Sequence, residues 1–150
     1  MIDKIQLQSE IERAANNKKD FDDVPLGLYE VKVEKMELVE TSEQSRKPGV
    51  PMVKIWFRIL RGEFKDRFIF FNRIILGTNN DGFAIHTCNE FLKSLQTSEV
   101  VKFNGYQDYA ELLLNIYDEI DRLGIEYALK YSENANGYKS YEIVEVFKNK

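Results

Sequence analysis

The clearest chemistry in this sequence comes from one tryptophan and two cations. Trp56 is the only tryptophan of the chain, and Lys54 and Arg58 flank it at a spacing of two residues in the segment PMVKIWFRIL. Aromatic rings stack on unpaired nucleic-acid bases, while lysine and arginine neutralise the neighbouring phosphates. The triplet therefore predicts a surface that binds single-stranded nucleic acid with little sequence preference.

Alternation along this segment predicts a strand that presents the triplet to solvent. Successive side chains of a strand point to opposite sides of a sheet. The aliphatic positions all share the side opposite Trp56, namely Val53, Ile55, Phe57 and Ile59. We expect that side to face the core. A register slip of one residue would exchange Trp56 with Phe57.

A second cationic strand is predicted from DRFIFFNRII, after a turn at Gly62. We expect Phe68, Phe70 and Ile74 on one side, and Arg67, Ile69, Phe71 and Arg73 on the side shared with Trp56. Two loops are expected to close over a bound strand, the loop TSEQSRKPGV and the last hairpin. The predicted nucleic-acid-binding residues are Lys54, Trp56, Arg58, Arg67, Phe71, Arg73, Arg46, Lys47, Tyr138 and Lys139.

The distribution of charge supports this site although the net charge is −4. Residues 44–73 contain eight basic and two acidic side chains, which leaves 13 basic and 23 acidic side chains elsewhere. Affinity for phosphate scales with the cations brought to it. The local excess, and not the net charge, therefore predicts an anion-binding face.

The remaining pattern predicts a mainly β domain with added helices. Alternation marks a first strand from Leu28 to Val39 and a terminal hairpin with the turn residues Asn136 and Gly137. Between residues 76 and 124 the apolar spacing changes to about 3.6, which predicts two helices. Three strands, a helical insertion between strands 3 and 4, and a hairpin are typical of the five-stranded OB-type β-barrel.

We expect two parts in the chain. Residues 1–20 are predicted to be an N-terminal helical extension, and residues 21–150 the OB-fold domain. No apolar run is long enough to span a membrane and no signal peptide is recognisable, which predicts a cytoplasmic protein without a membrane partner. One cysteine and one histidine cannot form a zinc-ligand set, and we expect no cofactor.

Four segments of the chain resemble a family of bacteriophage and prophage proteins. They are VPLGLYEVKVEKMELVET, GVPMVKIWFRILRGEFKDRFIFFNRII, GFAIHTCNEFLKSL and YALKYSENANGYKSYEIVEVF. That family is catalogued as a domain of unknown function, and its members are often labelled single-stranded-DNA-binding proteins with a presumed OB-fold. The resemblance implies a non-catalytic role in phage DNA replication or recombination, in a bacterial host cell, with replication or recombination proteins as further partners.

Several hypotheses stay open at this point. The binding residues fit DNA and RNA alike, and the edge strand of an imperfectly closed barrel allows a homo-oligomer. The acidic remainder of the chain favours an alternative function, a protein-interaction module or a phage inhibitor acting on a host or replication protein. A magnesium-dependent nuclease using Asp20, Asp22 and Asp23 is less favoured, because no phosphate loop or histidine-based metal motif is present. His86 and Cys88 are interpreted as ordinary helix residues, because no third, orienting group is identified.

Overall fold

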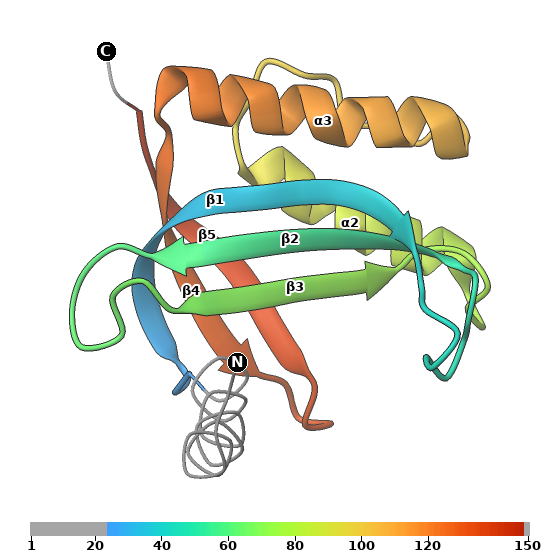
Figure 1. Ribbon diagram of the computed structural model, residues 1–150, viewed down its shortest axis with the longest axis horizontal. Helices are drawn as coiled ribbons and strands as arrows, with labels where there is room; N and C mark the ends of the chain where they lie inside the picture. The colour runs from blue at the N-terminus through green and yellow to red at the C-terminus, as the bar shows by residue number, and fades with distance from the viewer. Residues whose placement is uncertain (1–23, 149–150) are drawn as a thin grey trace, which may run out of the picture.

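The computed structural model, described here for residues 24–148, contains an antiparallel sheet with two helices packed on one of its faces (Figure 1). The elements are β1 (Gly27–Glu40), β2 (Pro51–Ile59), β3 (Phe68–Ile74), α2 (Asp81–Ser94), α3 (Tyr106–Leu123), β4 (Glu126–Glu133) and β5 (Lys139–Phe147). The strand order is β3-β2-β1-β4-β5. The five expected strands and the two expected helices after β3 are confirmed. The expected N-terminal helix falls outside the described residues.

The predicted closed barrel is wrong. β3 and β5 are the two edges of the sheet, and no strand pairing joins them. Aromatic rings lie between them: Phe71 of β3 stacks on Phe91 of α2 with ring centroids 4.7 Å apart, and Tyr141 of β5 packs edge-on against Phe71 at 5.1 Å. The two edges therefore meet through side chains and not through a backbone ladder, whose strands are spaced by roughly 4.8 Å. The sheet is therefore strongly curved but open, with β4 and β5 running steeply across β2 and β3 (Figure 1).

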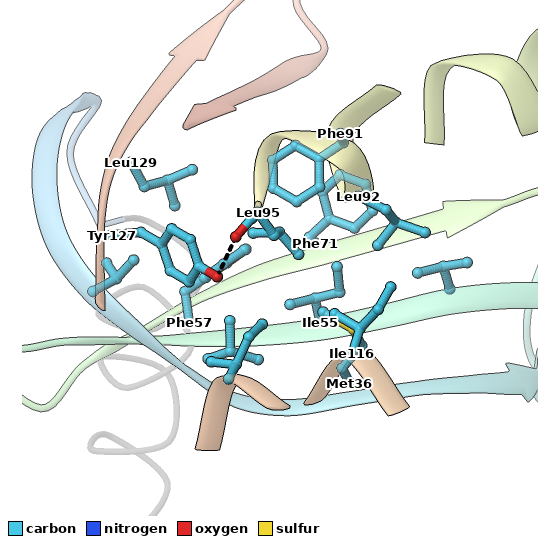
Figure 2. Packing of buried hydrophobic residues seen from close by; sticks show 14 of the residues in the cluster. Met36, Ile55, Phe57, Phe71, Phe91, Leu92, Leu95, Ile116, Tyr127 and Leu129 are labelled. Atoms are coloured by element: carbon cyan, nitrogen blue, oxygen red, sulfur yellow. Dashed lines mark hydrogen bonds between the residues drawn. The ribbon is translucent and has the colours of Figure 1, made fainter. Parts of the chain in front are cut away.

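The core lies between the sheet and the two helices (Figure 2). The aliphatic side of β2 is fully buried, as its alternation predicts, and so are Leu113 and Ile116 of α3. The Tyr127 hydroxyl donates a hydrogen bond of 2.8 Å to the carbonyl of Leu95, so this buried polar group is satisfied. α3 ends at Gly124, which has the left-handed conformation expected just past a helix.

A β-bulge in β1 changes which residues share a face. The register passes from Val33 opposite Phe57 to Lys35 opposite Trp56, which leaves Glu34 as the extra residue. Met36 and Leu38, which follow the bulge, remain on the core side of the strand. The same shift places Lys35 directly beside Trp56 on the outer side.

Gly77, in the turn between β3 and α2, has no room for a side chain. Its φ is +79°, and a Cβ atom would lie 2.9 Å from Cγ1 of Val50. The Lys47 ammonium also donates to the Gly77 carbonyl at 3.0 Å. The loop between β1 and β2 is therefore packed against this turn.

We expect Gly77→Ala to lower the free energy of unfolding by about 1–2 kcal/mol or more, because alanine is strained at positive φ and Val50 must also move. Urea denaturation followed by circular dichroism measures the loss. Gly49→Ala is the matched control, because Gly49 has a φ of +71° but no atom within 4 Å of its Cβ position. Equal losses in the two variants would show that the contact with Val50 contributes nothing.

Candidate nucleic-acid interface

The outer side of β2 and β3 carries three aromatic rings that are separate from the core. Trp56 lies opposite Phe70 in the strand register, and Arg58 lies opposite Phe68. The Trp56 ring meets the rings of Phe70 and Phe68 edge-on, with centroids 5.5 Å and 5.9 Å apart. All three rings are partly exposed, and none belongs to the buried core cluster. We call Trp56, Phe68 and Phe70 the aromatic face.

Two lysines bring positive charge to the aromatic face. The Nζ atoms of Lys35 and Lys54 lie 4.5 Å and 5.7 Å from the centroid of the Trp56 ring, within the range of a cation–π interaction. Lys35 is only 3.8 Å from the carboxylate of Glu37, which is a long ion pair. A phosphate next to a base stacked on Trp56 would therefore meet an ammonium group.

Arg58 is on the predicted side of the sheet but is engaged in ion pairs. Its Nε donates to Glu34 at 2.8 Å and its Nη1 donates to Asp66 at 2.9 Å. These two hydrogen bonds raise the pKa of the Arg58 guanidinium, and the bond to Glu34 has the larger effect. Because two carboxylates compensate its charge, Arg58 offers less free positive charge to an anion than the sequence predicts.

Phe71 and Arg73 do not share a side with Trp56, so their predicted placement is wrong. Phe71 lies opposite Ile55 and is only 1% exposed. Arg73 lies opposite Val53, on the same inner side of β3. The outer positions of β3 are instead Phe68, Phe70 and Asn72. They pair with Arg58, Trp56 and Lys54 of β2, in that order.

The other predicted residues lie in loops around the sheet, except Lys139, which is the first residue of β5. Arg67 precedes β3, with its guanidinium 5.2 Å from the centroid of the Phe64 ring. Arg46 is exposed in the loop between β1 and β2, where Lys47 instead holds the turn at Gly77. Tyr138 and Lys139 lie at the hairpin between β4 and β5, and Lys139 pairs with Glu133 at 2.9 Å.

Sequence reasoning missed Lys35, Phe68 and Phe70. A signal for Lys35 was present, because two successive charged residues interrupt the alternation between Val33 and Met36, as a bulge would. For Phe68 and Phe70 the signal was ambiguous, because the run FIFF is apolar on both sides of the strand.

His86 and Cys88 do not form a reactive pair. His86 is exposed on α2, whereas Cys88 is fully buried, and burial raises the pKa of its thiol to about 11. Since the thiolate is the nucleophile, Cys88 is inert near neutral pH. Within residues 24–148 no group of three or more histidine, cysteine, aspartate or glutamate side chains is placed to hold a metal ion. Asp20, Asp22 and Asp23 lie outside that range.

Fold and site together define a mainly β protein with an open five-stranded sheet whose outer side is aromatic and cationic. Neither helix in the described range is both long and apolar enough to cross a membrane. The chain belongs to the family described as protein of unknown function, DUF669, whose sequence model matches residues 11–149. No curated protein matches the chain.

Proposed function

We propose that the aromatic face, with Lys35 and Lys54, binds single-stranded DNA without catalysis. The observation that carries this proposal is the partly exposed Trp56 ring with two ammonium groups within 5.7 Å of its centroid. Stacking of one base on an aromatic ring contributes about 1–3 kcal/mol and tolerates any base. Unpaired bases offer the flat surfaces that a duplex hides, so the proposal favours single strands over duplexes.

The exposure of three large rings on one side of a sheet supports a ligand at this place. Apolar surface left in water forgoes about 25 cal/mol per Å², and contiguous apolar patches commonly mark interaction sites. The role in phage-type DNA replication or recombination is supported by the sequence resemblance alone. RNA is the other ligand that the same chemistry would accept.

Trp56 provides the measurement, because it is the only tryptophan of the chain. We expect oligo-dT to quench its emission, and the logarithm of the affinity to fall against the logarithm of the salt concentration by about 0.7 per phosphate contacted. A duplex of equal length should quench much less, and oligo-U compares RNA with DNA. Unchanged emission together with no gel retardation at low salt would refute the proposal.

A further inference from the structure

A groove separates the two edges of the sheet, β3 and β5. It consists of two adjoining hollows of about 490 and 400 Å³. The hollows share the residues Phe71, Arg73, Asn134, Lys139 and Tyr141. We call it the edge groove. Tyr141 lines both hollows, and its hydroxyl donates a hydrogen bond of 2.7 Å to the Phe70 carbonyl. This carbonyl at the β3 edge is therefore already hydrogen-bonded.

Arg73 offers a positive charge to the edge groove. Its Nη1 donates to the Thr87 hydroxyl at 2.9 Å, and its Cζ lies 5.5 Å from the centroid of the Phe71 ring. Among residues 24–148, no carboxylate lies within ion-pair distance of Arg73. The hydroxyl and the ring orient the guanidinium without neutralising it, which leaves it able to bind a phosphate with paired hydrogen bonds.

The smaller hollow is lined by aromatic and basic side chains. Its charged lining residues are Arg73 and Lys139, whereas the glutamates of the groove, Glu90 and Glu142, line only the larger hollow. Tyr138 also lines the smaller hollow, and this residue is 71% exposed. The side-chain oxygen of Asn134 accepts from the Tyr138 backbone N–H at 3.0 Å, which fixes the hairpin that carries the ring.

The edge groove begins where the aromatic face ends. Asn72 lines the smaller hollow and also lies opposite Lys54 on the outer side of β2 and β3. Asn72 is the diagonal neighbour of Trp56 on the adjacent strand, so the rim of the groove lies roughly 7–8 Å from Trp56. A strand of nucleic acid that crosses β2 and β3 would therefore pass Asn72 and reach the groove.

We propose that the edge groove is a second subsite for the same single strand, with a phosphate on Arg73 and a base stacked on Tyr138. This inference rests on the proposed function of the aromatic face. The bound nucleic acid runs across β2 and β3 and bends around the β3 edge into the groove. The site then covers more nucleotides than the aromatic face alone could hold.

The test uses Arg73→Gln and Tyr138→Ala in the full chain, with Arg122→Gln and Tyr106→Ala on α3 as matched controls. Labelled oligo-dT of about 4 and about 16 nucleotides spans the usual range of site sizes for a small binding domain. We expect Tyr138→Ala to weaken binding of the longer oligonucleotide by about 5- to 100-fold and to leave the shorter one nearly unchanged. Arg73→Gln should reduce the salt slope by about 0.7, and Arg73→Lys, which keeps the charge, should restore it.

The outcomes separate the two proposals. If Arg73→Gln and Tyr138→Ala bind both lengths of oligo-dT as tightly as the wild-type chain, the proposal of a second subsite is overturned. The proposal for the aromatic face is not affected by that result. Unchanged Trp56 emission together with no gel retardation in the wild-type chain would instead overturn the proposed function. A protein partner that Tyr138→Ala no longer binds, with binding to both oligonucleotides unchanged, would assign the groove to an extended peptide and also overturn this inference.

Discussion

Phe71→Ala should lower the free energy of unfolding by about 3–5 kcal/mol, the usual cost of removing a buried phenylalanine ring. Phe71 is 1% exposed, its ring is stacked on Phe91, and Tyr141 packs edge-on against it. Its removal leaves a cavity where β3, α2 and β5 meet. Phe70→Ala, one residue earlier on the partly exposed outer side, should cost only about 1 kcal/mol.

Urea denaturation of the two variants measures this difference in stability. Titration with oligo-dT should give the opposite ranking, with the larger loss of affinity in Phe70→Ala. Phe70→Ala removes a ring of the aromatic face and should weaken binding of an oligo-dT of about 4 nucleotides, whereas Phe71→Ala should bind this short oligonucleotide normally while it remains folded. A larger loss of stability in Phe70→Ala than in Phe71→Ala would contradict the assignment of the two sides of β3.

Trp56→Ala should weaken binding of single-stranded DNA by about 1–3 kcal/mol, the contribution of one stacked base. Its effect on the free energy of unfolding should be small by comparison, because the ring lies outside the core cluster. The substitution also removes the fluorescence signal, so the anisotropy of a labelled oligonucleotide provides the measurement.

Met52→Ala is the matched control for Trp56→Ala, because Met52 lies on the same strand and the same side, four residues away. Trp56→Phe should retain most of the affinity, since a phenyl ring also stacks on bases. Equal binding by Trp56→Ala and Met52→Ala would show that no base stacks on the tryptophan.

The sides of β2 could be predicted from the sequence because its pattern is unambiguous. From Val53 to Ile59, apolar residues at the odd positions alternate with Lys54, Trp56 and Arg58 at the even ones. Burial follows the same alternation, with the aliphatic positions fully buried and the others partly exposed. The two helices were equally predictable, because their apolar residues repeat at helical spacing and Gly124 marks the end of α3.

The sides of β3 and the closure of the sheet could not be predicted in this way. The cations Arg67 and Arg73 suggested the outer side of β3, but Arg67 precedes the strand and Arg73 lies near its end, at the rim of the edge groove. Whether β3 pairs with β5 depends on the packing of Phe71, Phe91 and Tyr141, which are far apart in the chain. Local periodicity contains no information about such contacts.

The bulge at Glu34 lets β1 contain one residue more than the register needs without exchanging its two sides. Val33 pairs with Phe57 and Lys35 with Trp56, so removal of Glu34 would leave a regular alternation, with Lys35 still on the outer side and Met36 still on the core side. A residue added elsewhere in β1 without a bulge would instead turn one end of the strand over, because the side chains of a strand repeat every two residues. In evolutionary terms, Glu34 is therefore the position at which this strand can lose one residue and keep both the core and the cationic surface.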